Sequence, residues 1–452
     1  MKHGQIHQRI RSGKAKSLFP SSALLAFVLF AAGCATPETL KSPTAAGLKP
    51  CDLVHSTDEI NDGSIHHEYH QFFELGERVR ESQRPEKLPP KKSVLVLSGG
   101  GAFGAYSAGV LCGWTEAGNR PKFDTVTGVS TGALVAVLAF LGPEYDDVLR
   151  QSYTEISSAG IYRTKPLVVA LLSDSLNDSK PLFKQIEETI TPDIVAKLAQ
   201  AYKEGRRLYV GTTDLDGRRP VVWDLSGIAA SGKPESRELI CKLLLASAAI
   251  PAFFPAVEIP IDVDGKKYVE RHVDGGLTQP LFFRPPHIPE EHRNEPLPSM
   301  LYGSDEYVIV AGKLYADPYP VRAQVLPIVG SSVTTFLHAQ TRDTLVKLYM
   351  QSMLTGMKYH LAAVPSDFVG LSSPIDFTPT GMTKLFEEGR KQALDGTVWR
   401  NMPPGIGERE ELLQRSGTSL TLVPHQETKD ETFRSDKMIQ LTNKVESDTE
   451  QR

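Results

Sequence analysis

Two segments of this chain share one pattern, in which a short apolar run ends in glycines and leads into a helix-like segment. The first is SVLVLSGGGAFGAYSAGVL, with its apolar run at residues 93–98. The second is TVTGVSTGALVAVLAFLG, with its apolar run at residues 125–129. Continuous runs of valine and leucine are typical of parallel strands buried on both faces. Repeated strand–turn–helix units therefore predict an α/β domain with a mainly parallel central sheet.

The same patterns predict further elements along the chain. Strands are expected at residues 207–215, 219–225 and 306–312, and helices at 237–249 and 383–394. Residues 336–361 carry apolar and methionine side chains at helical spacing, which favours core packing over a lipid-binding face.

Composition excludes several classes of function. The formal net charge is -4, so no basic field favours nucleic acid as a partner. The four cysteines form no CxxC pair and no metal-ligand spacing, so neither a zinc site nor a disulfide framework is expected.

The first 33 residues have the composition of a signal peptide. Basic residues from Lys2 to Lys16 precede the apolar run ALLAFVLFAAG, which ends directly at Cys34. This ending resembles a bacterial lipoprotein signal, in which the cysteine is lipidated and becomes the new N-terminus, although Ala31 stands where leucine is usual. By the same resemblance, Ala35 favours the outer membrane, where acyl chains on Cys34 would hold the protein at a bilayer surface. The alternative is a plain signal peptide.

The rest of the chain divides into three parts. Residues 34–92 are polar and rich in proline, with one helix-like stretch at about 67–80, and predict a tether. The folded domain is expected at residues 93–400. Residues 401–452 are polar with little hydrophobic periodicity, which predicts a flexible tail.

The glycine loop after the first apolar run has two possible uses. Gly99, Gly101 and Gly104 match the spacing of a dinucleotide-binding loop, with Asp124 as the candidate ribose-binding acid. However, Asp124 precedes its strand, whereas that acid normally follows one. Alternatively, the backbone N–H groups of consecutive glycines form an oxyanion hole, where the negative oxygen of a tetrahedral intermediate is stabilised.

Ser130 is the candidate nucleophile. Gly128-Val129-Ser130-Thr131-Gly132 matches the G-x-S-x-G elbow, in which a serine occupies a strained turn between a strand and a helix. The usual histidine partner is missing from any glycine-rich turn after the serine. The candidates that fail this test are His272, His287, His292, His338, His360 and His425.

Asp274 is the candidate base. It ends an apolar segment and is followed by Gly275 and Gly276, a context in which a carboxylate can accept the serine proton directly. An Asp-Gly pair is also a common hairpin turn, as expected at Asp264-Gly265 and Asp216-Gly217.

In this order, the motifs resemble the patatin-like phospholipase family. They are the glycine loop, the serine pentapeptide and Asp274-Gly275-Gly276, and the segment ASAAIPAFFPAVEI (246–259) matches the family's Ala-Ser-x-Ala-x-Pro-x-x-Phe-Pro pattern. The resemblance runs from about Ser93 to Trp399. One departure is Phe103, where the family commonly has arginine or lysine.

The resemblance implies a three-layer α/β/α fold and a lipid acyl hydrolase of phospholipase A or lysophospholipase type. It assigns Ser130 as nucleophile, Asp274 as general base and the amides of Gly99, Gly100 and Gly101 as oxyanion donors, with no cofactor or metal. Membrane phospholipid or another acyl ester would be the substrate. A non-catalytic, lipid-binding envelope lipoprotein of the same fold is the main alternative, and Phe103 is the feature that favours it. The proline-rich stretch 284–306 is expected to be an insertion rather than a lid.

Overall fold

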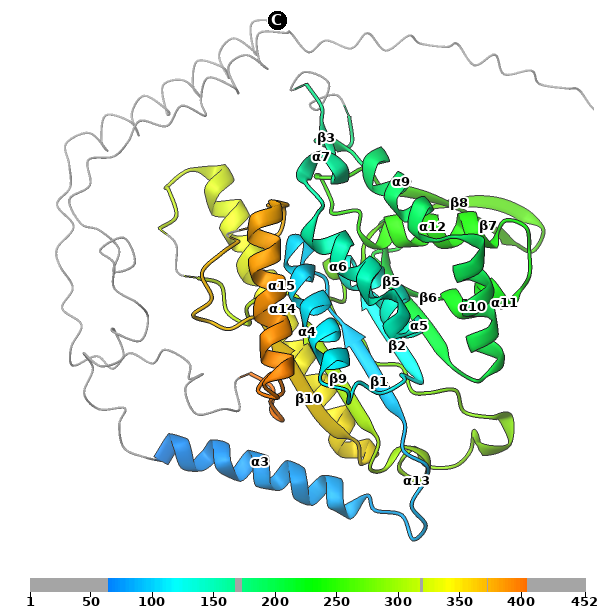
Figure 1. Cartoon of the computed structure of the whole chain (residues 1–452), viewed down its shortest axis with the longest axis vertical. Helices are drawn as coiled ribbons and strands as arrows, with labels where there is room; N and C mark the ends of the chain where they lie inside the picture. Colours follow the sequence, from blue (N-terminus) through cyan, green and yellow to red (C-terminus); the bar gives the residue numbers. More distant parts are fainter. Residues whose placement is uncertain (1–63, 167–172, 318–319, 372, 405–452) are drawn as a thin grey trace, which may run out of the picture.

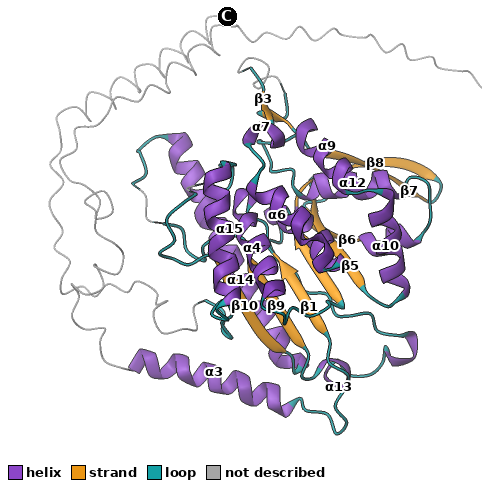
Figure 2. Cartoon of the chain, viewed as in Figure 1, coloured by secondary structure: helices purple, strands orange, loops and turns teal. Residues whose placement is uncertain are grey.

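The computed structural model describes residues 64–166, 173–317, 320–371 and 373–404 (Figure 1). The predicted signal peptide, Cys34 and nearly all of the predicted tail lie outside these residues. A central sheet lies between two layers of helices, which confirms an α/β fold with a mostly parallel sheet (Figure 2). The strands of this sheet, in spatial order, are β10 (Lys358–Ala363), β9 (Asp305–Val310), β1 (Ser93–Leu97), β2 (Thr125–Val129), β5 (Arg207–Asp214), β8 (Lys266–Asp274) and β7 (Val257–Val263), with β6 (Arg219–Asp224) also paired to β5.

The sheet is parallel from β10 to β5 and antiparallel beyond β5. The antiparallel end is built from the two expected hairpins. β7 and β8 are joined by Asp264 and Gly265, whose φ angles of 54° and 77° are those of the two-residue turn that matches strand twist. The turn between β5 and β6 contains Asp216-Gly217, as predicted.

One layer of helices covers the face of the sheet that carries Leu95, Leu97 and Val126. Alternate side chains of β1 therefore enter different cores, because successive residues of a strand point to opposite faces. The elements of this layer and its connections are η2 (Gly101–Phe103), α4 (Gly104–Glu116), α5 (Thr131–Leu141), η3 (Pro143–Tyr145), α6 (Asp146–Thr154), α7 (Ser158–Ile161), β3 (Arg163–Thr164), β4 (Asn177–Asp178), α9 (Lys180–Thr189), α10 (Pro192–Lys203), α11 (Leu225–Ala230), α12 (Ser236–Ser247) and α15 (Pro379–Leu394).

The opposite face of the sheet carries Val94 and Val96 and is covered mainly by α14 (Val325–Thr355). α3 (Ser64–Ser82) packs on α14 and is the helix expected near residues 67–80. None of the helices in the described ranges is long and apolar enough to cross a membrane.

The expectation of core packing at residues 336–361 is right for one side of α14 only. Leu345, Leu348 and Met353 are buried against the sheet, whereas Phe336 and Leu354, on the side opposite Leu345, are exposed. The helix ends at Thr355, and residues 358–361 belong to strand β10 instead. The start of the helix also projects beyond the strands that its second half covers (Figure 1).

Residues 284–304 connect the hairpin end of the sheet to β9. They contain η5 (Glu290–His292) and α13 (Pro298–Leu301), and Ser304 accepts a hydrogen bond from the N–H of Lys92, just before β1 begins. This places the segment at the amino-terminal edge of the parallel strands (Figure 1). Ser130 lies at the opposite, carboxyl-terminal edge, so the segment does not cover it.

Candidate active site

Ser130 lies between the end of β2 and the start of α5, in a strained conformation. Its φ of 56° and ψ of -128° are rarely adopted by a residue with a side chain. The turn is held by a buried hydrogen-bond chain, in which the Ser130 N–H donates to Oγ of Ser247 (2.9 Å) and that hydroxyl donates to the Gly211 carbonyl (2.7 Å). This is the geometry expected of a nucleophile elbow.

The flanking glycines are required by close packing of the backbone. A Cβ on Gly128 would overlap the carbonyl oxygen of Gly132, and a Cβ on Gly132 would overlap the carbonyl of Ser98. Only glycine therefore lets the strand, the elbow and the helix approach so closely.

Asp274 ends β8 and lies beside Ser130. Its N–H donates to the Ala249 carbonyl (2.9 Å), and its carboxylate accepts the N–H of Gly276 (2.8 Å). The start of η4 (Gly275–Leu277) thus holds the side chain in place. Burial raises the pKa of Asp274 to about 6, against the opposing effect of hydrogen bonds with Ser130 and Gly276.

The glycine loop lies against the same serine. A Cβ on Gly99 would come within 2.9 Å of the Ser130 Cβ, and Gly101 has a φ of 54° that favours glycine. Within the described residues, no hydrogen bond takes up the amide N–H groups of Gly99 and Gly100. Gly104 begins α4, so the positive end of that helix lies behind the loop.

Phe103 packs against the hydrophobic core. An apolar side chain suits this position because burying a charged one there would require a partner.

The structure contradicts the dinucleotide-binding interpretation of the loop. Asp124 precedes β2, where its carboxylate accepts hydrogen bonds from Nζ of Lys92 (3.0 Å) and the N–H of Ser93 (2.9 Å). This is the amino-terminal edge of the sheet, whereas the glycines follow β1 at its carboxyl-terminal edge. The acid and the loop are therefore on opposite edges and cannot hold the same ribose and pyrophosphate.

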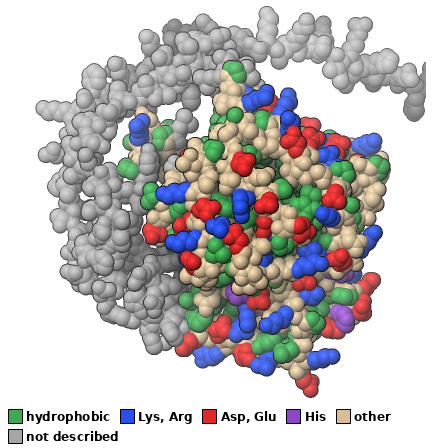
Figure 3. Space-filling model, in the orientation of Figure 1, with side chains coloured by type: hydrophobic (Ala, Val, Ile, Leu, Met, Phe, Trp, Pro, Cys, Tyr) green, Lys and Arg blue, Asp and Glu red, His purple; other side chains and the backbone are tan. Residues whose placement is uncertain are grey.

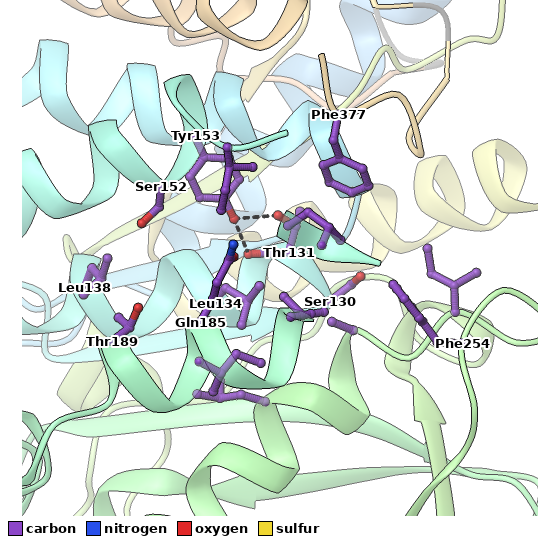
Figure 4. A pocket seen from close by; sticks show the side chains of 18 of the residues that line it. Ser130, Thr131, Leu134, Leu138, Ser152, Tyr153, Gln185, Thr189, Phe254 and Phe377 are labelled. Carbon is purple, nitrogen blue, oxygen red and sulfur yellow. Dashed lines mark hydrogen bonds between the residues drawn. The ribbon is translucent and has the colours of Figure 1, made fainter. Parts of the chain in front are cut away.

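An apolar cavity opens at Ser130 and runs between α5, α9 and α12 (Figure 4). Figure 4 shows Ser130, Phe254 and Phe377 at one end and Leu138 and Thr189 at the other. Leu134, Ile186 and Leu244 lie along the walls. Four phenylalanines flank the sequence motifs, namely Phe253, Phe254, Phe282 and Phe283. Of these four, only Phe254 lines this cavity within the described residues.

A hydrogen bond ties the elbow to the cavity wall. The hydroxyls of Thr131 and Tyr153 are 2.6 Å apart, and Tyr153 also donates to the Thr131 carbonyl (3.3 Å). Burial raises the pKa of Tyr153 to about 12, so the phenol stays protonated and can donate near neutral pH.

None of the histidines in the described residues hydrogen-bonds to Ser130. His272 is nearest in sequence to Asp274, and its ring contacts Thr212 (3.0 Å) and Glu270 (3.0 Å) instead. His338 and His360 are bound to the Thr334 carbonyl and to Asp305. The candidate base that the structure brings to the serine is therefore Asp274.

Residues 95–287 match the family model described as patatin-like phospholipase. This range contains the glycine loop, Ser130 and Asp274. The segment is therefore similar to patatin-like phospholipases.

Solved structures of low sequence identity are also similar to this chain. VipD from Legionella pneumophila is 13% identical over 70% of this chain and 68% of that protein, with a TM-score of 0.27. The type III effector ExoU is 15% identical over 69% of this chain and 53% of that protein, with a TM-score of 0.28. ExoU in its complex with SpcU, from Pseudomonas aeruginosa, is 16% identical over 69% and 52%, with a TM-score of 0.24. No curated protein sequence matches the chain.

Three supporting residues of the domain were not singled out from the sequence. Ser247 lies in the Ala-Ser-x-Ala segment at residues 246–249, so its motif was recognised but not its role in holding the elbow. Thr131 was recognised only as part of the pentapeptide. Tyr153 stands in no motif, and only the packing of α6 on α5 brings it to Thr131.

Proposed function

We propose that this protein hydrolyses fatty acyl esters of phospholipids or lysophospholipids through an acyl-enzyme on Ser130. The proposal rests on three features that lie together at the mouth of one apolar cavity. They are a strained serine, a buried carboxylate with a raised pKa, and a glycine loop whose amide groups at Gly99 and Gly100 make no hydrogen bond among the described residues. Each group supplies one requirement of ester cleavage.

The first half of the reaction forms the acyl-enzyme. Asp274 takes the proton from Oγ of Ser130 while this oxygen attacks the carbonyl carbon of the ester. The carbonyl oxygen becomes an oxyanion, which the amide groups of Gly99, Gly100 and Gly101 stabilise. The bond to the alcohol then breaks, and Asp274 returns its proton to the departing alcohol, which is the lysophospholipid or glycerol part of the substrate.

The second half releases the fatty acid. Asp274 takes a proton from water, whose oxygen attacks the acyl carbon and forms a second oxyanion in the same loop. The bond to Ser130 breaks, and the proton returns to Oγ. Because the pKa of Asp274 is about 6, most of the carboxylate is ionised at neutral pH and ready to act as a base.

The cavity supports a long acyl chain as the part of the substrate bound behind the carbonyl. Its walls are mostly aliphatic and aromatic, so transfer of a chain from water would be favourable by about 0.8 kcal/mol for each buried methylene. The headgroup would remain outside the cavity mouth.

We further propose that acyl chains on Cys34 attach the protein to the bacterial envelope, at the outer membrane. Support comes from the signal-like composition of residues 1–33 and from the position of Cys34 directly after them. Mass spectrometry of the envelope form would test this, because lipidation adds acyl mass to a new N-terminal cysteine that Cys34→Ala lacks.

The proposed reaction is tested by labelling with a fluorophosphonate, which reacts with activated serines. We expect Ser130→Ala to abolish labelling and turnover of a short-chain p-nitrophenyl ester. Ser152→Ala is the matched control, because Ser152 also lines the cavity but its hydroxyl donates within α6. Asp274→Asn should lower kcat/KM by about a hundredfold or more, the range of a lost general base.

Other outcomes would reject parts of the proposal. Well-folded wild-type protein that neither labels nor turns over would favour the lipid-binding alternative. An Asp274→Asn variant with most of its rate would remove Asp274 as the base, and His272 would be tested next.

A further inference from the structure

The first half of α14, residues 325–337, exposes a stripe of apolar side chains. Val325 is 76% exposed, Phe336 59%, and Val329 and Val333 52% each. Single exposed apolar residues are common on protein surfaces, but a continuous stripe of this kind marks an interaction site.

The stripe lies on the side of α14 opposite the side that packs on the sheet. With 3.6 residues in each turn, Val325, Val329, Val333 and Phe336 lie on one side of the helix. Thr334 lies on the other side, in line with the buried Leu345 three turns later. The stripe is thus no continuation of the core-facing side.

This part of the helix also lacks charged side chains. Between Arg322 and Arg342 the sequence AQVLPIVGSSVTTFLHAQT contains no aspartate, glutamate, lysine or arginine. By contrast, positive and negative side chains are mixed over the face of the molecule that Figure 3 shows. An apolar, uncharged surface favours an apolar partner, because binding requires no charge to be desolvated.

The stripe ends one turn before a contact between α14 and the candidate active site. Nε2 of Gln340 donates to the carbonyl of Thr278 (2.9 Å), which ties α14 to the turn that follows Asp274. Leu277 in that turn is 43% exposed. Ile375, 38% exposed, follows Pro374, whose carbonyl accepts the N–H of Ala102 in the glycine loop (2.8 Å). Exposed apolar groups therefore continue from α14 toward the cavity mouth.

We propose that the first half of α14 inserts its apolar stripe into the surface of a phospholipid bilayer and so presents the cavity mouth to lipid. The inference rests on the proposed function, since a substrate held in a bilayer must reach Ser130 from the membrane side. Arg322, exposed just before the helix, would lie among the phosphate headgroups. A bilayer suits this stripe better than a protein groove, because further exposed apolar side chains, Leu277 and Ile375, lie on the segments that follow Asp274 and contact the glycine loop.

The binding experiment uses the full chain with Cys34→Ala in every variant, so that no acyl chain at residue 34 contributes. Ser130→Ala is added to keep the vesicles intact. Co-sedimentation with phosphatidylcholine–phosphatidylglycerol vesicles is measured for this parent and for Val329→Asp with Phe336→Asp. We expect the double variant to bind at least about tenfold more weakly. Thr334→Asp, which adds a charge on the opposite side of the same helix, should bind like its parent.

The catalytic arm separates this proposal from the proposed function. With Ser130 restored, the double variant should hydrolyse a soluble short-chain ester at the wild-type rate and lose hydrolysis of vesicle phospholipid. If the Ser130→Ala variant still hydrolysed the soluble ester, that result would reject the proposed function, whatever the binding experiment showed.

A second measurement does not require the protein to tolerate a new charged side chain. Phe336→Trp should shift its fluorescence to shorter wavelength when vesicles are added, relative to the same chain with phenylalanine. An unshifted emission together with unchanged co-sedimentation of the double variant would overturn the proposal. If light scattering then showed that the double variant changes from dimer to monomer, the stripe would be a contact between two copies.

Discussion

At the residue scale, Asp274 combines burial with two hydrogen bonds, and the balance of these effects determines when it can act as a base. Burial disfavours the charged carboxylate, whereas the hydrogen bonds with Ser130 and Gly276 favour it. The net result is a pKa of about 6, which is above the ordinary value of 3.8 and still below neutrality.

The first prediction concerns the pH dependence of ester hydrolysis. A general base must be ionised, so kcat/KM should be nearly constant above a pH of about 6 and fall about tenfold for each pH unit below it. The profile is measured with a soluble ester that does not titrate in this range. A rate that stays constant down to the ordinary pKa of an aspartate would contradict the assignment of Asp274.

At the element scale, α5 carries both the candidate nucleophile and one wall of the cavity. Ser130 precedes its first residue, and Leu134 and Leu138 follow at intervals of about one turn. A rise of ~1.5 Å per residue puts Leu138 roughly 12 Å along the helix from Ser130. The length of α5 along the cavity therefore limits the length of an acyl chain bound at the serine.

The second prediction uses Leu138, which lines the far part of the cavity. Leu138→Phe should fill this end and move the preference for acyl length toward shorter chains, with little change for acetyl esters. The measurement is kcat/KM over a series of p-nitrophenyl esters from acetyl to palmitoyl. The larger side chain is expected to cost about 1–3 kcal/mol of stability, so thermal unfolding is measured in parallel. An equal loss for all chain lengths would show that the cavity does not hold the acyl group.

At the scale of the whole molecule, the two faces of the sheet have different roles. The face covered by α4, α5 and α12 contains the cavity, whereas the face covered by α14 contains Glu306 of β9, which is fully buried. Oε2 of Glu306 accepts a hydrogen bond from Oγ of Ser352, and Oε1 has no partner among the described residues. Burial raises the pKa of Glu306 to about 8.

The third prediction is a loss of stability as pH rises. The folded protein holds a proton on Glu306 that the unfolded chain releases above its ordinary pKa of 4.5. Because the folded state binds more protons in this window, the free energy of unfolding should fall as pH rises from about 4.5 to about 8. Glu306→Gln removes this contribution, so the variant should be more stable than wild type at the upper end of the window.

Denaturant unfolding of both proteins at several pH values checks this third prediction. The contribution of Asp274, which has the same sign over a smaller range, is common to both proteins and cancels in the difference. A constant difference in stability between wild type and Glu306→Gln across the window would contradict it.

The local sequence determined the elements and turns that were predicted correctly, because each depends on a few neighbouring residues, but its pattern did not separate the end of α14 from β10. Apolar runs predicted β1 and β2, glycines predicted the turns after them, and Asp264-Gly265 predicted a hairpin. The candidate residues Ser130 and Asp274 were also found this way, since each stands beside glycines that permit a tight turn. Their chemical roles remain predictions until the variants are measured.

The tertiary structure determined which residues from distant parts of the chain lie together, and no local pattern contains this information. The contact between Ser130 and Asp274 arises because β2 and β8 both lie next to β5. Strand pairing also placed Asp124 on the edge away from the glycine loop, which excluded the dinucleotide interpretation. Along α14, the side that carries Leu345 is buried in the second half, whereas Thr334 on the same side is exposed in the first half, because only the second half has a sheet to cover it. A periodic sequence determines which side chains share a face, but only the packed fold determines whether anything lies against that face.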